Sequence, residues 1–140
     1  RDVAVTGVHV CSSDLRDQGL SDQQWRVLRV LGEDHGQGGT GVETGRIARD
    51  AFIIGPSLSG VLTRMERDGL IERKRDADDQ RRTVVRATRE GLKRVAVLSQ
   101  TIEAHYAWME QQLGHAKLKQ LYDLLDEVIA LEVESASCEA

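Results

Sequence analysis

The sequence predicts a mainly α-helical protein that carries a small antiparallel wing of two or three β-strands. Apolar residues recur at spacings of three and four through most of residues 20–133, which is typical of helices with one buried face. Two short runs, residues 70–75 and 81–88, instead alternate as strands do. Proline and glycine stand where helices begin and end, so the boundaries of several elements can be read directly.

The overall composition fits a single globular domain of 140 residues, 40% hydrophobic and 30% charged. No apolar run approaches the ~20 residues that a membrane span needs, and no signal peptide is visible. We therefore expect a cytoplasmic protein without a membrane partner. Cys11 and Cys138 lie near opposite ends of the chain, and we interpret them as incidental thiols rather than redox sensors.

Positive charge is concentrated in one part of an acidic chain. The formal net charge is −4. Between Arg64 and Arg94, however, eleven Lys and Arg face seven Asp and Glu, which gives this segment +4 and leaves −8 for the remainder. Because the distribution of charge matters more than its sum, the basic segment remains a candidate for binding nucleic acid.

The first clear helix begins after Ser21, whose hydroxyl can cap it while Gln24 completes a capping box. Residues 1–14 before it have no clear helical period, and we treat them as an uncertain or artefactual N-terminus. The inner face of the helix is formed by Leu20, Gln24, Val27, Leu28 and Leu31.

Residues 32–45 hold six glycines in fourteen positions, and we interpret them as a flexible connector. A phosphate-binding loop is disfavoured because no Gly-Lys-Ser/Thr follows and no apolar strand precedes. Thr44 can cap a short helix over residues 45–53. Its inner side is expected to consist of Ile47, Ala48, Ala51 and Phe52.

Pro56 fits the first turn of the next helix, because the N–H that proline lacks would remain unbonded there. Gly69 supplies the C-terminal stop. Two helices joined by a tight turn form a helix-turn-helix, and residues 76–80 then join the two predicted strands into a hairpin. The inner face of the second helix is Leu58, Val61, Leu62 and Met65.

Two further helices follow. One opens around Thr88, Glu90 and Gly91, and Gly114 separates it from the next. Their apolar stripes exceed what one small lobe can cover, which indicates packing against a twin subunit; a helical hairpin within one chain is the alternative. The stripes are Leu92, Val95, Leu98, Ile102, His105 or Tyr106, Met109 and Leu113, then Leu118, Leu121, Leu125, Val128, Ile129 and Glu132 or Val133.

The helix-turn-helix, the hairpin and the spacing of Asp79, Arg81, Thr88 and Gly91 resemble the MarR family of winged helix-turn-helix transcriptional regulators. Within that family, residues 20–31, 56–73 and 79–82 are similar to regulators of homoprotocatechuate (4-hydroxyphenylacetate) catabolic operons. The resemblance covers about residues 15–135. It implies one domain over residues 15–140, with a winged lobe at 21–91 and dimerisation helices formed by 92–135 and the N-terminal segment. The chain departs from the family in its longer glycine-rich connector and in residues 1–14, which do not look like the family's first helix.

The outward face of the second helix supplies the expected contacts to double-stranded DNA. Ser57 and Ser59 lie by the helix N-terminus, where free N–H groups favour phosphate. Gly60 lets the helix approach base edges. Arg64 can reach a guanine or a phosphate, and a bidentate contact to the base would contribute about 1–3 kcal/mol of discrimination. Each side chain alone is more often simply solvated. The expected DNA-binding residues of this helix are Pro56, Ser57, Ser59, Gly60, Thr63, Arg64 and Arg67.

Arg81 and Arg82 lie beside the tip of the wing, and the resemblance implies that Arg81 enters the minor groove. Asp79 is unusual in a loop that faces DNA. It either supports the wing by pairing with Arg73 or Arg81, or serves simply to form the turn.

The resemblance also implies a phenolic carboxylate as effector. One family site beside the recognition helix matches Thr63 and Arg73, and a second location matches Arg16, Trp25 and Arg29. Trp25 is equally well explained as a core residue. No metal site or cofactor is expected, since the four histidines His9, His35, His105 and His115 lack ligand spacing.

These inferences predict a homodimeric repressor of an aromatic-compound catabolic operon, released from a pseudo-palindromic operator by its ligand. Two-fold symmetry would place the recognition helices about one DNA turn, roughly 34 Å, apart. The alternative is a helical protein-interaction module whose basic lobe binds an acidic partner. An enzyme is not expected, because the sequence has no nucleophile elbow, zinc motif or dinucleotide fingerprint.

Overall fold

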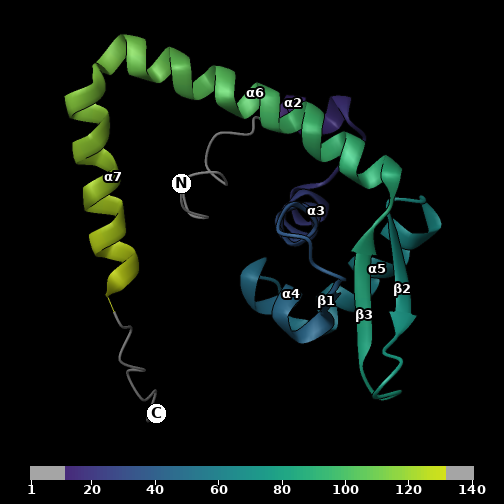
Figure 1. Ribbon diagram of the computed structural model, residues 1–140. Helices are drawn as coiled ribbons and strands as arrows, with labels where there is room; N and C mark the ends of the chain where they lie inside the picture. Colours follow the sequence, from purple (N-terminus) through teal and green to yellow (C-terminus); the bar gives the residue numbers. More distant parts are fainter. Residues whose placement is uncertain (1–11, 132–140) are drawn as a thin grey trace, which may run out of the picture. The chain divides into compact units, whose positions relative to one another are not determined.

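The computed structural model describes residues 12–131 of the chain, and Figure 1 shows its elements. His9, Cys11, Glu132, Val133 and Cys138 lie outside the described residues. The described residues divide into two compact units, 12–101 and 102–131. The elements are α2 (Ser12–Asp17), α3 (Asp22–Gly36), β1 (Val42–Glu43), α4 (Thr44–Asp50), α5 (Gly55–Arg67), β2 (Ile71–Arg75), β3 (Thr83–Ala87), α6 (Arg89–Leu113) and α7 (His115–Ala130).

The three strands form one antiparallel sheet in the order β1-β3-β2. Val85 in the middle strand lies opposite Val42 of β1 on one side and Arg73 of β2 on the other. The predicted class, mainly helical with a small antiparallel wing, is therefore confirmed. None of the helices in residues 12–131 is both long enough and apolar enough to cross a membrane.

The core of the first unit lies between α3, α4, α5 and the sheet. Leu28, Ile47, Met65 and Val85 are all 0% exposed. The predicted inner face of α5 is confirmed, because its four apolar residues are 0–3% exposed. Burying a side chain of this size contributes about 1.5–3 kcal/mol, so this stripe fixes which face of α5 remains outside.

The ends of α3 and α5 follow their predicted caps. Ser21 Oγ accepts a hydrogen bond from the Gln24 N–H at 3.2 Å, and Gln24 Oε1 accepts from the Ser21 N–H at 2.9 Å. Gly69 adopts φ 73 after α5. The next N–H, from Leu70, donates to the Met65 carbonyl, which completes a Schellman motif at the helix end.

The glycine-rich segment is not the flexible connector that the composition predicts. Its first part extends α3 to Gly36, and its last part contains β1. Asp34 holds the short loop between them: its carboxylate accepts from the Gly41 N–H at 3.1 Å and its carbonyl from the Gly39 N–H at 2.7 Å. A Cβ on Gly41 would lie 2.3 Å from Val84 Cγ1. Close packing against β3 therefore explains this glycine.

Two expectations for α4 are wrong. Thr44 is the first helical residue rather than the cap, which is Glu43 and forms no side-chain capping bond. Phe52 is 75% exposed instead of buried. The helix ends at Asp50, and Phe52 adopts φ 53, so the helical period no longer applies where Phe52 was placed inside. Ile47 and Ala51 are buried as expected.

Gly114, with φ 81, separates α6 from α7 as predicted. Of the two predicted stripes, Leu98, Ile102 and Leu118 are buried. In the second unit the rings of Tyr106 and Tyr122 lie 6.3 Å apart, which joins the two helices. Large apolar side chains nevertheless remain exposed on them: Trp108, Leu113, Leu121, Leu124, Val128 and Ile129.

Candidate nucleic-acid interface

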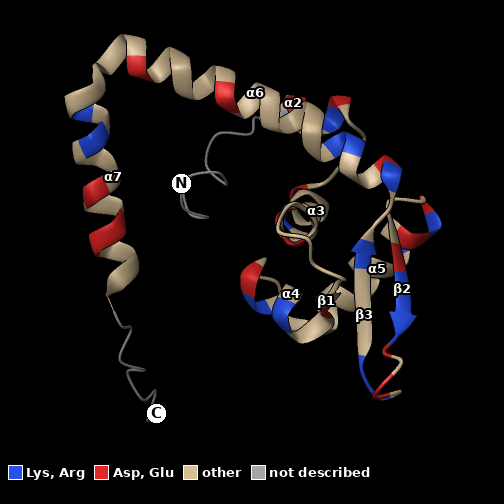
Figure 2. Ribbon diagram, in the orientation of Figure 1, with Lys and Arg blue, Asp and Glu red and all other residues tan. Residues whose placement is uncertain are grey.

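Helix α5 presents a polar face to solvent beside the basic wing. Pro56 lies in its first turn, and no side chain caps its N-terminus. Lys and Arg are carried on α5, β2, β3 and the first turns of α6 (Figure 2). The α5 residues predicted to contact DNA are all exposed: Pro56, Ser57, Ser59, Gly60, Thr63, Arg64 and Arg67.

These exposed residues differ in how far their polar groups are already used. Thr63 Oγ1 donates to the Ser59 carbonyl at 2.9 Å, and Arg67 Nε donates to the Asp68 carboxylate at 3.1 Å. Arg64 forms no ion pair with any residue from 12 to 131. Its guanidinium therefore has its full donor set available for a guanine edge or a phosphate.

Gly60 is not required by packing inside the protein. A Cβ at this position would meet nothing nearer than Arg64 Nη1, at 3.8 Å. A glycine in a helix interior costs roughly 0.5–1 kcal/mol relative to alanine. A close approach of this face of α5 to another molecule would explain why glycine is present at position 60 despite this cost in stability.

The wing is joined to α5 by an ion pair between Glu66 and Arg73. Arg73 Nη2 and Nε donate to the same Glu66 oxygen, at 2.6 and 3.0 Å. The Arg73 hydrogen bond holds the pKa of Glu66 below its ordinary value of 4.5, with partial burial opposing this and the Arg73 charge reinforcing it. The predicted pairing of Arg73 with Asp79 is thus wrong, because Arg73 is bound to the helix instead.

Because the pKa of Glu66 is lowered in the folded chain, its contact stabilises the protein above pH 4.5 and is lost as pH falls through the folded value. Glu66→Gln is therefore expected to unfold at a lower urea concentration than the unchanged protein at pH 7, and this difference is expected to shrink as the pH is lowered below 4.5. The matched control is Glu72→Gln, whose carboxylate lies 3.6 Å from Lys74. A difference that does not shrink as the pH is lowered would contradict the assignment.

Asp79 forms the turn at the tip of the wing. Its carboxylate accepts from the Arg81 N–H at 3.0 Å, and its carbonyl accepts from the Arg82 N–H at 2.9 Å. Asp76 Oδ1 accepts from the Asp78 N–H at 2.9 Å in the same way. Of the two interpretations of Asp79, formation of the turn describes these contacts. The Arg81 N–H also partly offsets the charge of the Asp79 carboxylate.

The two arginines beside the tip have different surroundings. Arg82, immediately before β3, pairs with Glu43 of the short strand β1. Arg81 is exposed and forms no ion pair within the described part of the chain. Arg75, at the end of β2, is exposed in the same manner. The wing therefore offers Arg81 and Arg75 to an anionic partner more readily than Arg82.

Thr88 and Gly91 connect the end of α5 to the start of α6. Thr88 Oγ1 donates to the Gly69 carbonyl at 2.6 Å and accepts from the Gly91 N–H at 3.2 Å. The Thr88 N–H donates to the Leu70 carbonyl at 3.0 Å. A Cβ on Gly91 would lie 2.2 Å from that same carbonyl oxygen. The sequence spacing marked both residues, but their structural role becomes clear only from these contacts.

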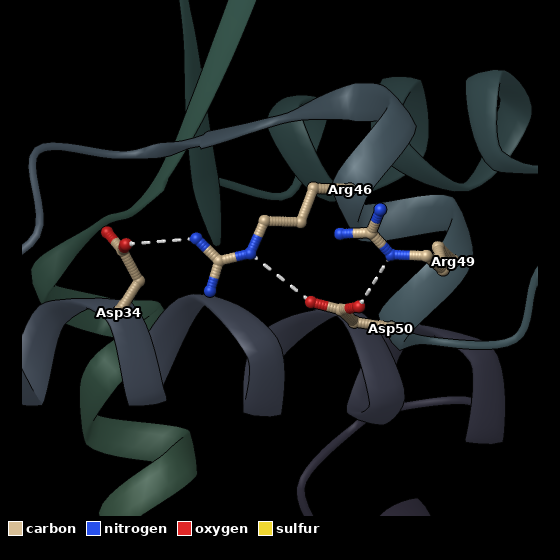
Figure 3. Close-up of polar contacts among 4 residues, drawn as sticks. All are labelled: Asp34, Arg46, Arg49 and Asp50. Atoms are coloured by element: carbon tan, nitrogen blue, oxygen red, sulfur yellow. Dashed lines mark hydrogen bonds and ion pairs between the residues drawn. The ribbon is translucent and has the colours of Figure 1, made fainter.

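A charged cluster that was not predicted fixes α4 against α3. Arg46 lies between Asp34, at 3.9 Å, and Asp50, at 3.2 Å, while Arg49 also contacts Asp50 at 3.3 Å (Figure 3). Exposed ion pairs contribute little stability individually, about 0–1 kcal/mol. Asp34 also binds the Gly41 N–H, so the cluster positions both the loop and the first helix of the helix-turn-helix.

The structure does not bring all the expected effector residues together. Trp25 is 2% exposed and Arg29 8%, so both belong to the interior. Burial lowers the pKa of Arg29, opposed by the Glu33 carboxylate and reinforced by Arg26. Arg16 instead lines an open groove of about 460 Å³ with Lys93, Arg94 and other residues, and neither Trp25 nor Arg29 lines it.

Thr63 and Arg73 both belong to the lobe that carries α5 and the wing, but each already has a partner, the Ser59 carbonyl and the Glu66 carboxylate respectively. Across residues 12–131, no group of three or more His, Cys, Asp or Glu side chains could hold a metal ion.

Comparison with known proteins identifies the family. The MarR family model matches residues 18–82. The homoprotocatechuate degradative operon repressor of Escherichia coli is 40% identical over 112 residues, which cover 80% of this chain and 72% of the repressor. The HTH-type transcriptional regulator FarR of Neisseria gonorrhoeae is 37% identical over 118 residues, covering 84% of this chain and 77% of FarR.

Solved structures support the same family assignment. The crystal structure of NadR in complex with 4-hydroxyphenylacetate superposes with a TM-score of 0.70 at 35% identity, covering 86% of this chain and 82% of NadR. The MepR–DNA complex from S. aureus superposes with a TM-score of 0.71 at 25% identity, covering 84% of this chain and 83% of MepR. The chain belongs to the MarR family of winged-helix transcriptional regulators.

Proposed function

We propose that the protein is a homodimeric transcriptional repressor that binds the operator of an aromatic-compound catabolic operon and leaves it when a phenolic carboxylate binds. The observation that carries this proposal is the polar outer face of α5 beside Arg81 on the wing, which is exposed and forms no ion pair within residues 12–131. The Escherichia coli relative, a homoprotocatechuate operon repressor, supports the class of target gene. The protein would act in the cytoplasm by binding, without catalysis.

In this proposal α5 enters the major groove and the wing reaches the adjacent minor groove. Arg64 binds a guanine edge or a phosphate, and Ser57 and Ser59 bind phosphate oxygens near the uncapped helix N-terminus. Arg81 enters the minor groove, where A·T-rich sequence concentrates negative potential. The alternative of a basic lobe that binds an acidic protein is disfavoured by the DNA-bound structure of MepR among the relatives.

Dimerisation would use α6 and α7, within the region 92–135 that we assign to subunit association. Leu124, Val128 and Ile129 on α7 are 54–62% exposed although apolar. A helical hairpin confined to one chain would leave these side chains in water. A twin subunit related by two-fold symmetry would cover them and would also place two α5 helices on one face of the duplex.

Val128→Arg is expected to weaken dimerisation on the order of a hundredfold, because a charge would be buried without a partner in the interface. Sedimentation velocity across a range of protein concentrations measures the change. The control is Asp126→Arg, an exposed polar position on the other side of α7. A Val128→Arg protein that sediments as the unchanged dimer would contradict the assignment of this face.

The effector would be a small phenolic carboxylate, the class of ligand that the NadR structure contains. Trp25 supports a site nearby, because its buried Nε1 N–H lacks an acceptor within residues 12–131. Arg29 is the candidate carboxylate ligand at this location, and Arg16 is the candidate in the separate groove that it lines with Lys93 and Arg94. Thr63 and Arg73 are the candidates beside α5. To release DNA, the ligand must bind more tightly to the subunit arrangement that does not fit the operator.

The test begins with a duplex selected from a random library by the purified protein. Gel shifts then measure its release by 4-hydroxyphenylacetate, homoprotocatechuate and salicylate, and thermal shifts measure stabilisation of the free protein. The proposal predicts that at least one of these compounds does both. Arg64→Ala should bind the selected duplex more weakly and discriminate less against altered base pairs. A protein that selects no sequence would contradict the proposal.

A further inference from the structure

Two large apolar side chains lie exposed in the turn that leads into α5. Phe52 is 75% exposed and Ile54 is 77% exposed, whereas Ile53 between them is buried at 5%. Single exposed apolar residues are common on protein surfaces, but these two lie within three residues of one another in a single turn, and we call them the patch. The patch consists of Phe52 and Ile54 and precedes the first proposed DNA contact, Pro56, by two residues.

The backbone at this turn does not explain why Phe52 is aromatic. Its φ of 53 is one that glycine or asparagine adopts with less strain than phenylalanine does. Arg26 holds the turn in place, since its Nη1 donates to the Ala51 carbonyl at 2.9 Å and to the Phe52 carbonyl at 3.1 Å. The side chain therefore gives the folded protein neither core packing nor turn formation.

The position of the patch points to the partner. Ile54 is the N-cap residue of α5, and its carbonyl accepts from the Ser57 and Leu58 N–H groups at 2.9 and 3.0 Å. The patch is thus continuous with the end of the helix that would enter the major groove. In that groove the apolar group that base pairs display is the C5 methyl of thymine.

We propose that Phe52 and Ile54 contact thymine methyl groups in each operator half-site, adding a preference for T·A pairs to the polar recognition by α5. This inference rests on the proposed function. The contact with thymine methyl groups would be additional to the contacts made by the charged residues and by the polar face of α5. Phosphates and polar base edges offer no apolar surface to Phe52 and Ile54.

The experiment uses the full-length protein and a duplex that it has selected from a random library. Each thymine is replaced in turn by deoxyuridine, which removes the methyl group and leaves the base pairing unchanged. The unchanged protein is expected to lose affinity about two- to fivefold at one or two thymines per half-site, the effect of one apolar methyl contact. Losses at no thymine would overturn the inference.

Two variants assign the effect to the patch. Phe52→Gly relieves the backbone strain and is expected to melt at the same or a higher temperature, so a loss of affinity cannot be attributed to misfolding. Ile54→Ala removes the other side chain. Both should bind the thymine duplex as weakly as the unchanged protein binds the uracil duplex, and should no longer distinguish the two. The control is Thr40→Ala, at an exposed position in the loop before β1, outside the proposed DNA-binding and dimerisation residues.

The remaining outcomes distinguish failure of this inference from failure of the proposed function. Variants that still distinguish thymine from uracil as the unchanged protein does would overturn the inference while leaving the proposed function intact. Variants that alter the sedimentation of the DNA-free protein would show that a second copy covers the patch, which also overturns it. Failure of the unchanged protein to bind any duplex at low salt would overturn the proposed function itself.

Discussion

Gly91→Ala is expected to lower the free energy of unfolding by about 2–3 kcal/mol, as overpacking of a filled interior does. The new Cβ would lie 2.2 Å from the Leu70 carbonyl oxygen and 3.2 Å from Leu28 Cδ2. The oxygen belongs to the backbone and already accepts from the Thr88 N–H, so it cannot swing aside as a side chain would. Relief requires the start of α6 to move away from β2. Urea unfolding at a fixed protein concentration measures the loss.

The matched control is Gly45→Ala in α4, where a Cβ would meet no atom within 4 Å. There the same substitution is expected to raise stability by roughly 0.5–1 kcal/mol, because alanine favours the helix. If Gly91→Ala unfolded at the same urea concentration as the unchanged protein, the close approach between α6 and the Leu70 carbonyl would be absent in solution.

Arg81→Ala is expected to weaken binding to every duplex by about tenfold, an effect of roughly 1.4 kcal/mol, and to reduce the salt dependence by about one unit of slope. Arg81 is exposed near the tip of the wing and forms no ion pair within residues 12–131. Its whole charge is therefore available to DNA, and no internal contact must break first. Fluorescence anisotropy of a labelled duplex at several salt concentrations measures both quantities.

Arg82→Ala is the matched control, because it removes the same charge from the next position. Since Arg82 already pairs with Glu43, its loss should weaken DNA binding less than that of Arg81. Equal losses from the two substitutions would indicate a general charge effect. No loss from Arg81→Ala would remove the wing from the interface.

Local signals allowed much of the fold to be predicted from the sequence. The buried stripe of α5, the capping box at Ser21 and Gln24, and the helix ends at Gly69 and Gly114 all depend on residues within a few positions of one another. Such features are determined by helical period and by backbone preference, both of which can be read from short segments.

The features that were missed depend on contacts between distant positions or on a change in backbone conformation. Composition alone could not show that Gly41 packs against Val84 of a later strand. Phe52 follows the helical period of α4 in sequence, but the left-handed backbone at its own position turns it outward. A helical pattern cannot reveal where the helix stops unless a recognisable stop signal is present.

In the candidate site, too, local sequence predicts some features, whereas others depend on contacts between distant residues. The outer face of α5 could be predicted because it is the complement of the buried stripe, and all its expected residues are exposed. The partners of charged residues could not be predicted. Arg73 had several nearby carboxylates in sequence, and only the packing of the wing on α5 selects Glu66.

The salt dependence of DNA binding by the unchanged protein tests the central claim most directly. If two copies of α5 and the wing straddle a duplex, several phosphates are neutralised and condensed counterions are released. The logarithm of the association constant should then fall linearly with the logarithm of salt concentration, losing on the order of a thousandfold between 50 and 200 mM for six phosphate contacts. Binding that is equally strong across this range, or absent at its lower end, would contradict the account.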